Sequence, residues 1–147
     1  GSLWSPPYVR WLHDLARSLA LEDAVIFAGH ASQQAMVTYY RHADLYVSMS
    51  EHEGFGKPLV ESMYFDLPVL AYASTGVPDT LGGAGVLFHA KNFEALAELA
   101  DLLMHDQTLR TQVLARQRAR LHTFLMPAVR AQWQRYLDLF WNGNPLQ

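Results

Sequence analysis

Apolar residues recur along this chain at two different spacings. Between residues 7 and 20 they occur every three or four positions, which predicts an amphipathic helix. Four short apolar runs lack this spacing and are bounded by glycine, proline or polar residues: 24–30, 44–50, 68–73 and 85–89. Runs of this length and composition are typical of strands that are buried on both faces of a sheet.

Further helices are predicted between these runs. Each begins near a residue that favours a helix N-terminus: Ser32, Pro58, Asn92, Asp106 or Thr108, and Pro127. Pro58 suits the first turn in particular, because its missing N–H would have no partner in the helix there. Strands that alternate with helices through short connections predict an α/β fold, a Rossmann-like parallel sheet flanked by helices.

Composition narrows the class of protein. The 147 residues are 50% hydrophobic and 17% charged, as in a globular domain with its own core. A net charge of −3 indicates no nucleic-acid partner. The absence of cysteine excludes disulfides and thiolate metal sites, and it fits a cytoplasmic location. The opening residues 1–2 look like the remnant of a tag.

The C-terminal third combines basic and aromatic residues. Six of the nine arginines fall between Arg110 and Arg135. They form either a solvated helix face or a contact with an anionic membrane surface or another domain. Trp133, Tyr136 and Trp141 lie on the last predicted helix, and helix packing accounts for them unless a further domain covers them.

Two acids, Glu53 and Glu61, flank a turn built from glycine and proline. The turn follows the predicted strand at residues 44–50 and leads into a helix, and ligands of open α/β sheets bind at this end of the strands. Gly54 and Gly56 allow close approach of a ligand, and the helix N-terminus, together with Lys57, favours an anion such as a diphosphate.

The two acids suit different tasks. A carboxylate accepts two hydrogen bonds side by side, which matches the vicinal hydroxyls of a ribose, and Glu61 is placed for this. Glu53, on the loop, is better placed to bind hydroxyls of the group attached to the phosphate. The alternative is a pair of solvated acids near a helix start, which the helix dipole favours in any protein. Leu59 stands where the dinucleotide fingerprint needs its third glycine.

The surrounding sequence resembles the retaining nucleotide-sugar glycosyltransferases of group 1 (family 4), whose fold has two domains and is called GT-B. Glu53 and Glu61 match the Glu-x7-Glu motif of their donor-binding domain. Similar segments flank the motif on both sides: "VIFAGHAS", "YYRHADLYVSMS" and "DLPVLAYASTGVPDTLGGAGVLF". The resemblance therefore predicts the C-terminal, donor-binding half of a GT-B glycosyltransferase.

The resemblance implies a role for each site residue. Glu53 would be the catalytic residue, binding donor-sugar hydroxyls near the reacting carbon, and Glu61 would bind the ribose. The remaining residues would hold the base, the diphosphate or the sugar: Gly29, His30, Ala31, Gly54, Phe55, Gly56, Lys57, Pro58 and Leu59. No metal ligand and no cofactor are expected, and the donor would be a GDP- or UDP-sugar.

The resemblance also implies an activity and a location. The enzyme would transfer a hexose, with mannose favoured, to a glycan or lipid-linked acceptor with retained configuration. It would act in the cytoplasm or at the inner face of the membrane. Two other classes stay open from the sequence: a sugar-nucleotide epimerase or phosphorylase of related fold, and a non-catalytic nucleotide-binding module.

The chain departs from the family pattern at its start. The family's donor domain opens with a strand and helix that carry an Arg and Lys pair for the diphosphate, and residues 3–147 are expected to begin after them. The N-terminal acceptor domain is likewise expected to lie outside this chain. The chain is thus expected to be part of a larger enzyme and to catalyse no transfer by itself.

Overall fold

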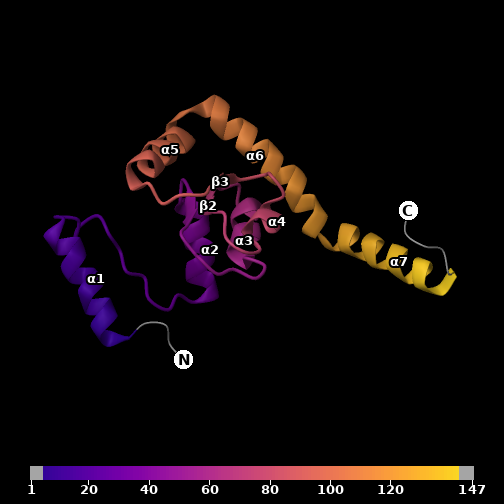
Figure 1. The fold of residues 1–147 in the computed structure, drawn as a ribbon, viewed down its shortest axis with the longest axis horizontal. Helices are drawn as coiled ribbons and strands as arrows, with labels where there is room; N and C mark the ends of the chain where they lie inside the picture. The colour runs from indigo at the N-terminus through magenta and orange to yellow at the C-terminus, as the bar shows by residue number, and fades with distance from the viewer. Residues whose placement is uncertain (1–4, 143–147) are drawn as a thin grey trace. The chain divides into compact units, whose positions relative to one another are not determined.

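The computed structural model describes residues 5–142, and the chain divides into two compact units. Gly1–Met36 form the N-terminal unit, and Val37–Gln147 form the sheet unit, which contains every strand of the described residues. Figure 1 shows the order of the elements along the chain. The predicted tag remnant at residues 1–2 lies outside the described residues.

The N-terminal unit begins with the predicted amphipathic helix. Helix α1 spans Pro6–Ser18, with prolines in its first turn, where no backbone N–H is needed. Leu19 caps it, and Ala20 ends it in the left-handed conformation, with φ at 53°. Helix α2 spans Gln33–His42 and begins as predicted after Ser32, whose hydroxyl accepts a hydrogen bond from the Ala35 N–H at 3.2 Å.

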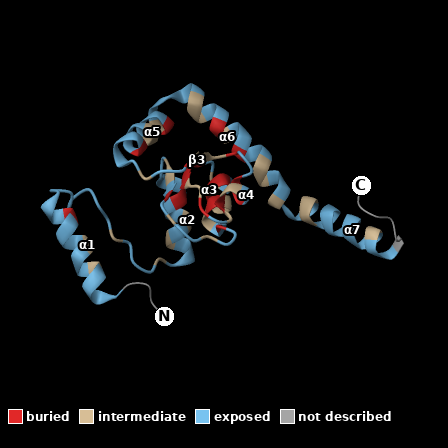
Figure 2. Ribbon diagram, in the orientation of Figure 1, coloured by how far each residue is buried: buried red, intermediate tan, exposed pale blue. Residues whose placement is uncertain are grey.

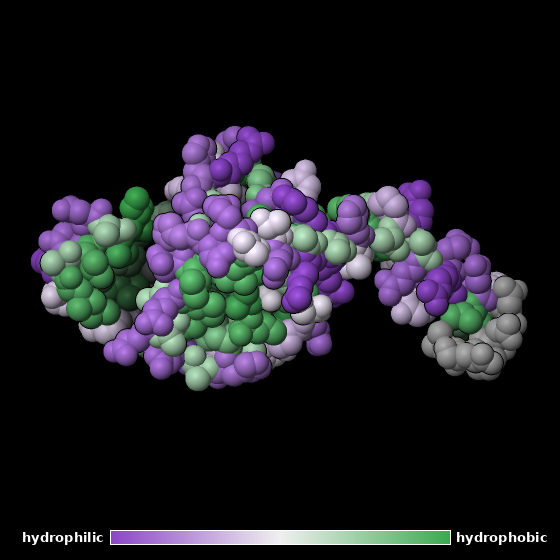
Figure 3. All heavy atoms as spheres, turned by 90° about the horizontal axis from the view of Figure 1, so that it is seen from above, coloured by the Kyte–Doolittle hydropathy of each residue, from purple (hydrophilic) through white to green (hydrophobic). Residues whose placement is uncertain are grey.

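The strand predicted at residues 24–30 is wrong. Residues 22–24 form a turn, and residues 25–29 pair with no strand of the described chain. Ile26 is 86% exposed, and Figure 3 shows apolar surface, in green, over the region that contains α1. An apolar run marks a segment that favours burial, but a strand forms only by hydrogen bonding to a neighbour. Within residues 5–36 no neighbouring strand exists.

The other three predicted strands form one parallel sheet in the sheet unit. They are β1 (Tyr46–Ser48), β2 (Val69–Tyr72) and β3 (Val86–Phe88), in the order β1-β2-β3. In this register Tyr46 lies beside Val69 and Leu70 beside Val86. The carboxyl ends of the strands therefore lie at one edge of the sheet, and the loops that follow β1 and β2 meet there.

Helices cover both faces of this sheet, as predicted. Side chains alternate along β2, so that Val69 and Ala71 pack with α3 (Lys57–Tyr64) and α4 (Val77–Leu81). Leu70, between them, packs with α5 (Phe93–His105) and α6 (Gln107–Leu121) on the other face. Figure 2 shows most of the buried residues, in red, around the sheet and these helices.

Side-chain caps begin two of the helices where the sequence predicted them. Asn92 accepts a hydrogen bond from the Ala95 N–H at 3.2 Å. Asp106, rather than Thr108, caps α6 and accepts from the N–H groups of Thr108 and Leu109 at 2.8 and 2.9 Å. The η1 turn (His122–Phe124) and helix α7 (Met126–Asn142) follow α6.

The aromatic residues of α7 are largely exposed in the described chain. Trp133, Tyr136 and Trp141 are 63%, 50% and 75% exposed, so helix packing inside residues 5–142 does not account for them. The cause is geometric, because α7 contacts η1 and makes no extensive contact with the helices that cover the sheet.

A buried side chain joins α6 to the start of β2. Gln117 is 1% exposed, and its amide nitrogen donates to the Leu67 carbonyl at 2.6 Å. Its amide oxygen accepts from the Val69 N–H at 2.9 Å. The side chain thus pairs two buried backbone groups that water cannot reach.

Candidate functional site

The loop after β1 leads directly into the N-terminus of α3. Gly56 precedes the helix in the left-handed conformation, with φ at 69°, and a Cβ there would lie 2.6 Å from the Leu59 side chain. Lys57 is the first helical residue, and Pro58 lies in the first turn as predicted. Pro58 has no N–H, and the Leu59 N–H donates to the Gly56 carbonyl at 2.8 Å, so the Lys57 N–H and the helix dipole give this end of α3 a partial positive charge.

Glu61 is held at both of its carboxylate oxygens. Oε2 accepts a hydrogen bond from the Tyr40 hydroxyl at 3.0 Å, and Oε1 lies 3.3 Å from Nζ of Lys57. The Glu61 side chain is 35% exposed, whereas that of Lys57 is 81% exposed. Lys57 is therefore free to turn toward a phosphate at the helix N-terminus, while Tyr40 keeps the carboxylate in place.

Tyr40 is a buried positioning residue for Glu61. Its ring stacks on that of Phe65 with centroids 5.3 Å apart, and the side chain is closed off from solvent. Burial raises the pKa of the Tyr40 phenol well above its ordinary value, and the hydrogen bond to the negative Glu61 raises it further. The phenol thus remains a hydrogen-bond donor to Glu61 across the physiological range.

The raised pKa of Tyr40 makes stability depend on pH in alkaline solution. A group whose pKa is raised by folding stabilises the fold below its unfolded pKa of about 10 and loses that contribution above it. We expect the free energy of unfolding to fall between pH 10 and 12, by up to about 1.4 kcal/mol per pH unit from this group. Urea unfolding at several pH values should show a shallower decline for Tyr40→Phe.

The matched control for this measurement is Tyr39→Phe, which removes an exposed hydroxyl from the same helix. It should leave the decline between pH 10 and 12 as steep as in the unaltered chain. Equal slopes for Tyr40→Phe and the unaltered chain would contradict the assigned role of Tyr40.

Glu53 lies on the loop after β1, and the loop after β2 fixes its backbone. The Glu53 N–H donates to the Thr75 hydroxyl at 2.9 Å, and that hydroxyl donates to the Glu53 carbonyl at 2.6 Å. The same carbonyl accepts from the Gly76 N–H at 3.0 Å. No ion pair involves the Glu53 carboxylate among residues 5–142. The backbone is therefore held while the carboxylate stays available to a ligand.

The fold brings the two acids to the same end of the sheet, beside Tyr46. Burial raises the pKa of the Tyr46 phenol, and the negative charges of Glu53 and Glu61 both raise it further. A hydrogen bond with Ser48 opposes this shift. Both carboxylates therefore lie close enough to Tyr46 to act on one phenol.

An aromatic contact connects the glycine turn to α6 and η1. Phe55, which is 54% exposed, meets the Phe124 ring edge-on with centroids 5.5 Å apart. Arg120 lies 4.8 Å from the centroid of the Phe124 ring and donates from Nε to the Thr80 carbonyl at 3.0 Å. The Thr80 hydroxyl in turn donates to the Phe55 carbonyl.

The structure brings together only part of the predicted site. Residues 54–59 lie in one turn and helix start, between Glu53 and Glu61. Gly29, His30 and Ala31 belong to the N-terminal unit, and their role beside a base stays a prediction. Sequence reasoning missed the supporting residues Tyr40, Tyr46, Thr75 and Gly76. Their positions lie within segments that carry the family resemblance, but only the fold shows what they contact.

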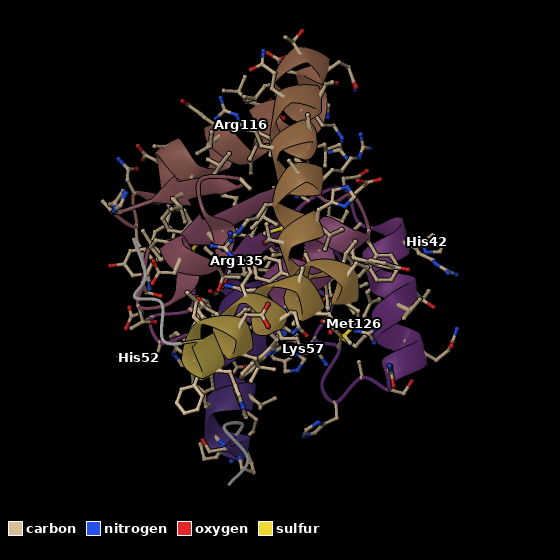
Figure 4. The ribbon with its side chains drawn as sticks, turned by 90° about the vertical axis from the view of Figure 1, so that its right-hand side faces the viewer. His42, His52, Lys57, Arg116, Met126 and Arg135 are labelled. Carbon is tan, nitrogen blue, oxygen red and sulfur yellow. The ribbon has the colours of Figure 1, made fainter. Side chains whose placement is uncertain are left out.

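The described residues provide no group of side chains suited to a metal ion. Figure 4 shows His42 on α2 well apart from His52, which follows β1. Figure 4 also labels Lys57, at the start of α3.

None of the helices in residues 5–142 is both long and apolar enough to span a bilayer. Contact with an anionic membrane surface stays a prediction.

Comparison with known proteins identifies the family. Residues 1–120 match the family described as "Glycosyl transferases group 1". The chain belongs to this family. The resemblance found in the sequence is thereby confirmed, and the family match favours a transferase over an epimerase or a phosphorylase.

Individual glycosyltransferases are similar to this chain as well. The chain is 32% identical over 100 residues to D-inositol 3-phosphate glycosyltransferase of Corynebacterium aurimucosum, a match that covers 67% of this chain and 24% of that enzyme. It is 26% identical to the C-terminal domain of the group 1 protein LpcC from Francisella tularensis, with a TM-score of 0.68. This match covers 80% of this chain and 62% of the LpcC chain.

A second solved structure carries a nucleotide. Anabaena Alr3699/HepE in complex with UDP is 26% identical to the chain, with a TM-score of 0.75 over 90% of this chain and 37% of that one. These neighbours confirm the predicted fold class, the C-terminal half of a GT-B glycosyltransferase. The chain spans 24% of the Corynebacterium enzyme, so it corresponds to one part of such proteins.

Proposed function

We propose that this chain binds the nucleotide-sugar donor of a retaining group 1 glycosyltransferase, whose acceptor-binding domain lies in another part of the protein. The observation that carries the proposal is the arrangement around α3. Glu61 is oriented by Tyr40, and Glu53 presents an unpaired carboxylate on a fixed backbone. A diphosphate bound between them would meet the positive end of α3.

Each part of the donor meets a group of suitable chemistry in this proposal. The ribose hydroxyls donate to Glu61, and the sugar hydroxyls donate to Glu53. The diphosphate draws the Lys57 side chain away from Glu61 and accepts a hydrogen bond from the Lys57 N–H at the start of α3. Because the leaving diphosphate gains negative charge as the sugar is released, this end of the helix stabilises the transition state.

The donor is proposed to be a nucleoside diphosphate hexose. UDP in the Anabaena structure supports a uridine donor, whereas the sequence resemblance favoured mannose, which points to GDP-mannose. Calorimetric titration of the chain with UDP, GDP, UDP-glucose and GDP-mannose distinguishes these donors. Binding of neither nucleotide would contradict the proposed function.

Replacing Glu61 tests the proposed ribose contact. Glu61→Gln keeps the shape of the side chain and an oxygen for Tyr40, but it removes the charge. We expect the affinity for the bound nucleotide to fall by roughly 10- to 100-fold, because hydrogen bonds to a charged group contribute about 1.5–3 kcal/mol. Isothermal titration calorimetry measures the change directly.

The control variant is Glu98→Gln, which removes an exposed acid from α5 and should leave nucleotide affinity unchanged. A nucleotide without ribose 2′ and 3′ hydroxyls provides a second control. With that nucleotide, Glu61→Gln should cause almost no loss of affinity, because the ribose hydroxyls that Glu61 would bind are already absent. Equal losses with both nucleotides would show that Glu61 acts elsewhere than on the ribose.

A further inference from the structure

Thr75 has an unusual backbone conformation next to the proposed site. Its φ is 38°, in the left-handed region, and Thr75 is one of three residues other than glycine with positive φ among residues 5–142. A β-branched side chain is disfavoured there because its branches crowd the backbone. Such strain persists only where the surrounding structure holds it, and it occurs most often at functional sites.

The hydroxyl of Thr75 makes a reciprocal pair of hydrogen bonds to one residue. It accepts from the Glu53 N–H at 2.9 Å and donates to the Glu53 carbonyl at 2.6 Å. Both backbone groups of Glu53 are thus bound by one side-chain atom from a different loop. Thr75 thus combines a left-handed backbone with two hydrogen bonds to the backbone of Glu53.

The neighbouring contacts hold the loops together but do not replace the two hydrogen bonds of Thr75. The Ser74 hydroxyl donates to the Ser50 carbonyl at 2.7 Å, before Glu53 in the chain. The Gly76 N–H donates to the Glu53 carbonyl, which leaves Thr75 as the partner of the Glu53 N–H. Loss of the Thr75 hydroxyl would therefore free the Glu53 N–H and the attached Cα while the loops remain joined.

We propose that Thr75 is a positioning residue, which fixes the backbone of Glu53 so that its carboxylate meets the hydroxyls of the donor sugar. This inference rests on the proposed function. It assigns to the loop after β2 a role in recognising the sugar, distinct from the recognition of the nucleotide by Glu61 and α3. In this proposal Thr75 acts on the donor through the backbone of Glu53.

Two variants separate positioning from general stability. Thr75→Val keeps the branched shape and removes the hydroxyl, whereas Thr75→Ser keeps the hydroxyl. We expect Thr75→Val to weaken binding of the sugar nucleotide about tenfold relative to binding of the corresponding nucleoside diphosphate. Thr75→Ser should restore the ratio of the two affinities. Calorimetry with UDP and UDP-glucose, and with GDP and GDP-mannose, measures this ratio.

A measurement without ligand tests the hydrogen bonds themselves. Amide hydrogen exchange followed by NMR should show the Glu53 N–H protected in the unaltered chain and in Thr75→Ser. In Thr75→Val the exchange of this N–H should be at least about tenfold faster.

The outcomes of the two measurements are distinguishable. Unchanged protection of the Glu53 N–H in Thr75→Val would overturn the inference, as would equal losses of affinity for the nucleotide and the sugar nucleotide. Absence of nucleotide binding by the unaltered chain would instead count against the proposed function. The exchange measurement needs no nucleotide, so it would still test the hydrogen bonds of Thr75.

Discussion

Replacing Gly76 with alanine is expected to destabilise the sheet unit by at least about 3 kcal/mol, the upper end of the range for overpacking. A Cβ at this position would lie 1.8 Å from the Gly54 carbonyl oxygen and 3.1 Å from that of Glu53. Both obstacles are backbone atoms, so no change of rotamer relieves the collision. The two loops would have to separate, and the hydrogen bonds that hold Glu53 would be lost with them.

Chemical denaturation measures the loss for Gly76→Ala, and nucleotide titration measures its effect on the site. The matched control is Gly54→Ala on the facing loop, where an added Cβ has no atom within 4 Å and φ is not in the left-handed region. This control should change the free energy of unfolding by less than about 1 kcal/mol. Similar stability of Gly76→Ala and Gly54→Ala would contradict the packing of the two loops described above.

Replacing Gln117 with leucine is expected to destabilise the sheet unit by about 3 kcal/mol. Leucine fills a similar volume but pairs with neither the Leu67 carbonyl nor the Val69 N–H, and both are buried. Each unpaired buried group costs about 1–3 kcal/mol. The midpoint of thermal unfolding should fall on the order of 10 °C for a domain of this size.

The control for this prediction lies on the same helix. Gln112→Leu makes the same chemical change at an exposed position of α6, and its effect on stability should be within about 0.5 kcal/mol. Gln117→Asn provides a further check, because it keeps the amide but shortens its reach, and it should be destabilising as well. A Gln117→Leu variant as stable as Gln112→Leu would show that water or a rearranged backbone satisfies the two groups.

Much of the fold follows from local signals. The helix starts at Ser32, Asn92 and Asp106 are confirmed because a capping side chain bonds to N–H groups two or three residues away. Proline in the first turn of α3 acts over an equally short range. A helix satisfies its own backbone, so its pattern is visible in one stretch of sequence.

A strand needs a partner, and one of the four predicted strands was wrong. The predicted strands that became β1, β2 and β3 are confirmed, and each of them pairs with a neighbouring strand. Residues 25–29 have similar composition but pair with no strand in the described chain. Composition reports that a segment favours burial, and only the fold decides whether a partner lies beside it.

By itself, the sequence determined the helix starts, the alternation that makes a parallel sheet, and the family, through the spacing of Glu53 and Glu61 around a glycine turn. Only the tertiary structure decided how those acids are held. Tyr40 on α2 is 21 residues from Glu61 on α3, and Thr75 is 22 residues from Glu53. The first contact joins two helices, and the second arises because parallel strands bring their following loops to one edge. Contacts across such distances in the chain follow no local periodicity, so the sequence carries no pattern from which to predict them.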